Sequence, residues 1–215
     1  MELWSYFQQN SGKIIDKWHH YFPVYEKYFS EYRNKKVTFI GIGVFRGGSL
    51  QMFSEYLGPL ATVIAIDIDE NCKTHESDFA HVRIGDQGDP NFLESVLNEF
   101  GPPDVVLDDG SHQMHHVRAS FDYLYPMLSK NGTYMVEDLH TAYWQEYGGG
   151  YLQKDSFIEY SKNLIDQLNF QHVREDISSP QWIRDTSSIS FHGSIVVFEK
   201  GSMTPKRDSA TGTTQ

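Results

Sequence analysis

The stretch Val105-Val106-Leu107-Asp108-Asp109-Gly110-Ser111-His112 is a short apolar run that ends abruptly in acidic residues, with a histidine just beyond them. The same pattern returns in Met135-Val136-Glu137-Asp138-Leu139-His140. The chain between the two runs is long enough for one helix and one strand. In parallel α/β sheets, side chains just past the carboxyl ends of the strands meet the ligand. We therefore expect both acidic pairs at the ligand-binding edge of such a sheet.

The two acidic pairs also predict a metal ion. Neighbouring strands lie about 5 Å apart, so the four carboxylates converge on one small volume. Carboxylates so close together repel one another unless a cation or a proton offsets their charge. A divalent cation is the simplest solution, because oxygen ligands suit a hard ion such as Mg²⁺.

A strand and a glycine turn begin the predicted sheet. Residues 36–43 read as a buried strand that runs into glycines, and residues 44–50 turn into a helix that continues to about Tyr56. Glycines allow the backbone to approach a ligand closely, and the first turn of the helix offers free N–H groups. This position, after the first strand and before a helix, favours a nucleoside-containing ligand.

Acidic residues follow the next two strands. The strand at 62–69 contains Asp67, at the place where nucleoside-binding α/β folds put a carboxylate on the ribose hydroxyls. A helix N-cap or a turn residue is the alternative interpretation of Asp67. The strand at 80–84 precedes Asp86 and Gln87, a carboxylate and an amide that suit the edge of an adenine.

The remaining pattern predicts an α/β, doubly wound, Rossmann-like sheet of seven strands, mostly parallel with an antiparallel last strand. Helices are expected at 90–100, 114–128 and 156–168, and late strands at 170–176 and 189–199.

We predict three segments. Residues 1–34 form a helical N-terminal extension whose aromatic stripe either packs on the sheet or acts as a lid over a pocket. Residues 35–200 form the main domain, and residues 201–215 are a disordered tail by composition.

Composition excludes several classes of protein and of site. The net charge of −11 argues against a nucleic-acid surface. No apolar run approaches the length of a membrane span, and no signal peptide is visible, so we expect a cytoplasmic protein. A single cysteine, Cys72, excludes an internal disulfide and a multi-cysteine zinc site.

Together these motifs resemble class I S-adenosylmethionine-dependent methyltransferases, and more narrowly the metal-dependent O-methyltransferases of macrolide sugars, the mycinamicin and macrocin type. The likeness spans about residues 13–199. The segments that carry it are Lys17–Phe22, Ile42–Leu50, Ile66–Asp69, Gly85–Gln87, Asp108–His112 and Glu137–Trp144.

The resemblance implies S-adenosylmethionine and Mg²⁺ as cofactors and a hydroxyl of a sugar, glycan or glycosylated natural product as the acceptor. It implies Asp109, Glu137 and Asp138 as metal ligands and His112 as the general base. The cofactor-binding residues that we predict are Gly43, Arg46, Gly47, Ser49, Asp67, Asp86, Gln87 and Asp108. Gly41 departs from the pattern, because relatives usually carry an acid there. Relatives can also carry a further N-terminal domain, so homo-oligomer formation stays open.

Three other interpretations remain at this point. Asp109, His112 and His140 would suit the iron site of an oxygenase. A nicotinamide-dependent dehydrogenase is disfavoured because the glycine motif is incomplete. A non-catalytic nucleoside-binding module would leave the acidic pairs without a function. A catechol-like diol is an alternative acceptor, because two vicinal oxygens would chelate the metal equally well.

Overall fold

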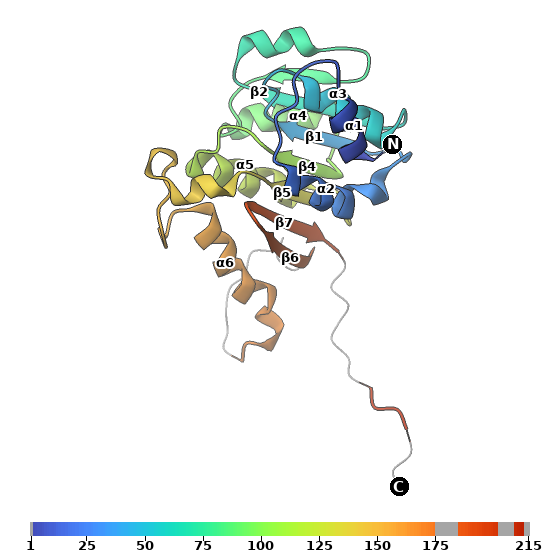
Figure 1. Cartoon of the computed structure of the whole chain (residues 1–215). Coiled ribbons are helices and arrows are strands. Elements are labelled where there is room, and N and C mark those ends of the chain that lie inside the picture. Colours follow the sequence, from blue (N-terminus) through green and yellow to red (C-terminus); the bar gives the residue numbers. More distant parts are fainter. Residues whose placement is uncertain (1, 175–184, 202–208, 213–215) are drawn as a thin grey trace.

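A computed structural model describes residues 2–174, 185–201 and 209–212. Its centre is a seven-stranded sheet with the order β3-β2-β1-β4-β5-β7-β6 (Figure 1). Strands β1 to β5 pair in parallel, and β7 runs antiparallel to both β5 and β6. The predicted sheet is therefore confirmed. Its strands are β1 (Thr38–Ile42), β2 (Thr62–Asp67), β3 (His81–Ile84), β4 (Val105–Asp108), β5 (Thr133–Val136), β6 (Thr186–His192) and β7 (Ile195–Lys200).

Helices cover both faces of the sheet. One layer contains α1 (Leu3–Gln9), α2 (Phe22–Phe29) and α3 (Gly48–Leu57); the other contains α4 (Pro90–Phe100), α5 (Met114–Met127) and α6 (Phe157–Leu168). Successive strand residues face opposite layers: Phe39 packs with α2 and α3, whereas Ile40 packs with α5. Since both faces are buried, the strands read as continuous apolar runs in the sequence.

The register of the central strands brings the two acidic pairs together. Asp108 pairs with Ile42 of β1 on one side and with Val136 of β5 on the other. One residue further, the backbone N–H of Asp109 donates to Ile42 (2.9 Å), and that of Glu137 donates to Asp108 (3.0 Å). The acidic pairs therefore leave the sheet side by side, as the sequence predicts.

Two predicted elements were wrong. Residues 170–172 form a short 3₁₀ turn and not the start of a strand, and residues 175–176 lie outside the described residues. The single strand predicted at 189–199 is the hairpin of β6 and β7. It turns at Gly193-Ser194, where Ser194 has a φ of 64°. Only His192, Gly193 and Ser194 interrupt the apolar pattern here, and so short a break is not recognised as a turn from the sequence.

The N-terminal extension is only partly helical. Residues 10–18 form an irregular segment between α1 and the 3₁₀ turn η1 (His19–Tyr21). The side chain of Asn10 accepts from the N–H of Gly12 (3.0 Å) and donates to the carbonyl of Lys13 (2.9 Å). Such local bonds compete with helix formation and explain why α1 ends at Gln9.

Within the predicted tail, residues 202–208 and 213–215 lie outside the described residues. Among the helices of the described residues, none combines the length and the apolar character needed to cross a bilayer.

Candidate active site

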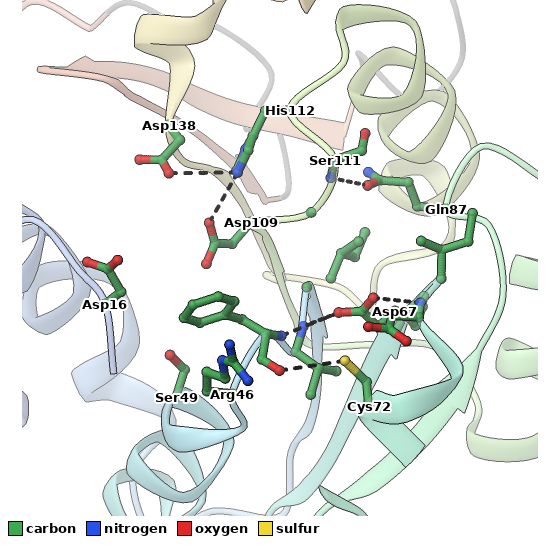
Figure 2. Close-up of a pocket in the computed structure, with 18 of the residues that line it drawn as sticks. Asp16, Arg46, Ser49, Asp67, Cys72, Gln87, Asp109, Ser111, His112 and Asp138 are labelled. Atoms are coloured by element: carbon green, nitrogen blue, oxygen red, sulfur yellow. Dashed lines mark hydrogen bonds and ion pairs between the residues drawn. The ribbon is translucent and has the colours of Figure 1, made fainter. Parts of the chain in front are cut away.

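A cavity of about 930 Å³ lies beyond the carboxyl ends of the parallel strands. This volume suits a ligand of drug-like or cofactor size. One part of its wall carries Asp67 and Gln87, and another part carries Asp109, His112 and Asp138 (Figure 2). Asp86 also lines the cavity. Six of the eight residues predicted for the cofactor therefore line one continuous space with the residues predicted for catalysis.

Asp109, His112 and Asp138 form a compact group in this wall. One ligand atom from each lies within 4.8 Å of the others. The Nε2 atom of His112 is 4.0 Å from Oδ1 of Asp109 and 3.8 Å from Oδ2 of Asp138 (Figure 2). His112 and Asp138 both have a φ of 57°, a left-handed conformation that costs a non-glycine residue free energy and is typical of functional sites. Among the described residues, no other such group gathers closely enough to hold an ion.

Glu137 faces a different neighbour. Its Oε1 atom is paired with the ammonium of Lys17, which also contacts Oδ2 of Asp109. Its Oε2 atom accepts a hydrogen bond from the hydroxyl of Tyr25. Both oxygens of Glu137 are thus occupied by donors of the protein. The third predicted metal ligand consequently lies next to the Asp109–His112–Asp138 group but is not part of it.

The charges around Glu137 are strongly coupled. Burial and the neighbouring charge of Asp109 raise the pKa of the Glu137 carboxyl to about 8, although Lys17 acts in the opposite direction. Burial by itself lowers the pKa of Lys17, but the charges of Asp109 and Glu137 outweigh it and raise that pKa above its ordinary value. Lys17 is therefore a buried ammonium ion held between the carboxyl groups of Asp109 and Glu137.

The structure tests whether these residues fit Mg²⁺. Tyr21 donates to Oδ1 of Asp138 (2.6 Å), and Lys17 contacts Oδ2 of Asp109. One oxygen of each aspartate, Oδ2 of Asp138 and Oδ1 of Asp109, is left facing His112. Mg²⁺ is commonly held by one or two carboxylates and keeps several waters, so this donor set fits it.

The same geometry disfavours the iron-site interpretation. The Nδ1 atom of His140 lies 2.8 Å from the hydroxyl of Ser194, and its ring stacks on Trp18. His140 is not part of the group of potential ligand atoms around Asp109. A site with two histidines and one carboxylate is therefore not assembled here.

In the cofactor part of the cavity, Asp67 organises the glycine turn. Its Oδ2 atom accepts from the N–H of Val44 (2.8 Å), and its Oδ1 atom accepts from that of Asp69 (2.9 Å). Burial acts to raise the pKa of the Asp67 carboxyl, but these backbone donors hold it below its ordinary value. Both interpretations of Asp67 are compatible with this geometry: it supports the turn, and it also lines the cavity.

Asp108, predicted among the cofactor-binding residues, does not line the cavity. Because side chains alternate along β4, it points away from Asp109, towards α5, and is only 2% exposed. It accepts from Ser120 (2.7 Å) and from the amide of Gln87 (3.1 Å). Gln87 in turn accepts from the N–H of Ser111 (2.8 Å). Asp108 therefore positions Gln87, which lines the cavity.

The glycine turn supplies the remaining predicted cofactor residues. Gly43, Arg46 and Ser49 line the cavity, whereas Gly47 does not. Gly47 precedes α3 with a φ of 76°, and a Cβ atom there would lie 2.6 Å from the ring of His75. Its contribution is to the shape of the turn.

Sequence reasoning missed Lys17 and the polar ends of Tyr21 and Tyr25. The aromatic stripe predicts either packing or a lid for these tyrosines, and Lys17 enters only within the resembling segment Lys17–Phe22. The three residues recur every four positions, and all three donate to Asp109, Glu137 or Asp138. A lysine that continues an aromatic stripe at helical spacing was the signal available in the sequence.

Several curated proteins are similar to this chain in sequence. The chain is 34% identical over 206 residues to demethylmacrocin O-methyltransferase of Streptomyces fradiae, covering 89% of this chain and 52% of that protein. It is 33% identical to mycinamicin VI 2''-O-methyltransferase of Micromonospora griseorubida, covering 85% of this chain and 48% of that protein. The chain is a homologue of sugar O-methyltransferases. It spans about half the length of the curated relatives it matches. No protein-family model matches it.

Solved structures of a homologue have the same fold. The MycE methyltransferase of the mycinamycin biosynthetic pathway, in complex with Mg and S-adenosylhomocysteine, superposes with a TM-score of 0.83 at 30% identity. The match covers 94% of this chain and 54% of MycE. This homologue shares the class I methyltransferase fold, which confirms the predicted fold class.

Proposed function

We propose that this chain is an S-adenosylmethionine-dependent, Mg²⁺-dependent O-methyltransferase that acts on a hydroxyl of a sugar, a glycan or a glycosylated natural product. The observation that carries the proposal is the single cavity joining Asp67, Asp86 and Gln87 to the Asp109–His112–Asp138 group. Its homologues named for sugar O-methylation, and MycE with bound Mg and S-adenosylhomocysteine, support it.

The chain's own residues suggest how the reaction proceeds. Asp67 would hold the ribose hydroxyls, Asp86 with Gln87 would face the adenine, and the bound S-adenosylmethionine would supply the methyl group. Asp109 and Asp138 would hold Mg²⁺, with Glu137 as the third acid. When bound, Mg²⁺ supplies a positive charge that orients the acceptor oxygen and lowers the pKa of its hydroxyl.

His112 would act as the general base. Its Nε2 atom lies beside both aspartates, within reach of a hydroxyl held there. An imidazole accepts a proton near neutral pH. As the acceptor oxygen forms its bond to the methyl carbon, the bond from carbon to sulfur breaks, His112 keeps the proton, and S-adenosylhomocysteine leaves.

The decisive experiment combines calorimetry with turnover. S-adenosylmethionine and S-adenosylhomocysteine are titrated into the protein with Mg²⁺ and with EDTA, and methyl transfer is then measured on a panel of glycosides and catechols. We expect binding of both compounds and glycoside methylation that EDTA abolishes. Turnover that is insensitive to EDTA would contradict the metal site, and no binding would contradict the methyltransferase itself.

A matched pair of variants tests the acidic group. Asp109→Asn keeps the shape of the side chain but removes its charge, so we expect turnover to fall by at least about two orders of magnitude while S-adenosylhomocysteine still binds. Asp166→Asn makes the same change at an exposed position on α6 and should leave both quantities unchanged. Wild-type turnover in Asp109→Asn would exclude Asp109 as a ligand.

A further inference from the structure

Lys17 occupies the space between two of the acids proposed to hold the metal. Its ammonium contacts Oδ2 of Asp109 and Oε1 of Glu137, and its side chain is only 3% exposed. The contacts join residues 92 and 120 positions apart in the chain, so tertiary folding alone creates them.

These contacts use the atoms that a metal ion would need. Tyr25 already donates to the other oxygen of Glu137. Glu137 therefore has no oxygen without a protein donor while Lys17 remains in place. An ammonium and a divalent cation within a few ångströms also repel each other strongly in a site of low dielectric constant. Asp109 and Glu137 therefore cannot bind the ammonium of Lys17 and the metal ion at the same time.

The segment that carries Lys17 is suited to movement. Residues 10–18 contain no regular secondary structure, and Ile14 and Trp18 on either side of Lys17 are 61% and 51% exposed. Asp16, Lys17 and Trp18 line the same cavity as the acids, and Figure 2 shows Asp16 at its wall. A lysine side chain is long and flexible, so its ammonium can leave the acids and reach the open cavity without unfolding α2.

We propose that Lys17 is an internal competitor for the divalent cation, and that its ammonium leaves Asp109 and Glu137 when the metal ion binds. Lys17 holds the acids together without metal, and its withdrawal releases Glu137 as the third ligand. Lys17 is thus a positioning residue that sets the metal affinity of the site. This inference rests on the proposed metal dependence.

The first test is calorimetric titration of Mg²⁺ into the wild type and Lys17→Met without cofactor. Removal of the competing charge should tighten Mg²⁺ binding by at least about tenfold. Lys13→Met makes the same change at an exposed position of the same segment and should bind Mg²⁺ like the wild type. If Lys17→Met binds Mg²⁺ no more tightly than the wild type does, the inference about Lys17 is overturned, but the metal site is not. An absence of binding in all three proteins overturns the metal site as well.

The second test uses the unaltered protein, in case Lys17→Met does not fold. Lysines are acetylated with an amine-reactive reagent in EDTA or in excess Mg²⁺, and each site is quantified by mass spectrometry. We expect Lys17 to be protected in EDTA and modified several-fold faster in Mg²⁺, with exposed Lys13 as the internal reference. A Lys17 that stays equally protected in Mg²⁺ overturns the inference.

Discussion

At the scale of single residues, burial decides the chemistry of Cys72. Its thiol lines the cofactor part of the cavity and donates to the carbonyl oxygen of Phe45 (Figure 2). Burial, reinforced by the charge of Asp67, raises the pKa of this thiol to about 11. The thiolate is the reactive form, and a raised pKa keeps the thiol neutral until the pH approaches that value.

We therefore predict slow alkylation of Cys72. At about pH 8 the rate with iodoacetamide should lie about two orders of magnitude below that of a cysteine of ordinary pKa, and it should climb up to about pH 11. Mass spectrometry measures the rate directly, because Cys72 is the single cysteine of the chain. Urea-unfolded protein is the control. A folded protein that reacts as fast as the unfolded one at about pH 8 would contradict the prediction.

At the scale of elements, the close approach of β1 to β4 depends on Gly43. Its φ is 98°, and a Cβ atom there would lie 2.1 Å from the carbonyl oxygen of Asp109. The clash is with the backbone of Asp109, which can move away only if the ends of β1 and β4 separate. Gly101 offers a matched comparison, because it has a φ of 83° but nothing within 4 Å of its Cβ position.

Gly43→Ala should therefore destabilise the protein far more than Gly101→Ala. The second substitution introduces only backbone strain, about 1–3 kcal/mol. Gly43→Ala adds the steric clash to this strain, so the free energy of unfolding should fall by several kcal/mol more in this variant than in Gly101→Ala. Urea unfolding of both variants measures the difference. Equal losses would show that the end of β1 yields easily, and that the glycine turn is less rigid than the structure indicates.

At the scale of the whole molecule, the N-terminal extension is part of the core. Phe29 of α2 is fully buried, and its ring packs 6.0 Å from those of Phe39 in β1 and Phe53 in α3. These contacts favour packing on the sheet over a lid as the interpretation of the aromatic stripe. Tyr21 and Tyr25, on the same helical stretch, also reach the acids of the site.

The extension should consequently unfold together with the sheet. In a variant that retains only Trp4 and Trp18, fluorescence reports on residues 1–34, while far-UV circular dichroism reports on the sheet and the other helices. We expect the two urea transitions to coincide, because the extension and the sheet share one apolar cluster. A fluorescence transition at clearly lower urea would instead indicate a separately folding lid.

Sequence reasoning succeeded where local periodicity and chain order were sufficient. Alternating apolar runs and helices determined a parallel sheet, and the ends of parallel strands meet at one edge. Asp109, His112 and Asp138 could therefore be assigned to one site before any contact was known. The hairpin of β6 and β7 escaped because its turn interrupts the apolar pattern too briefly to be recognised.

Only the tertiary structure decided which side chains face that site. Alternation along β4 separates Asp108, buried against α5, from Asp109, which faces the cavity. Lys17 shares the four-residue spacing of Tyr21 and Tyr25, but this spacing does not show that its ammonium contacts Asp109 and Glu137, which lie 92 and 120 positions further along the chain. Contacts between residues so distant in the chain depend on how the layers pack, and packing is a property of the folded molecule.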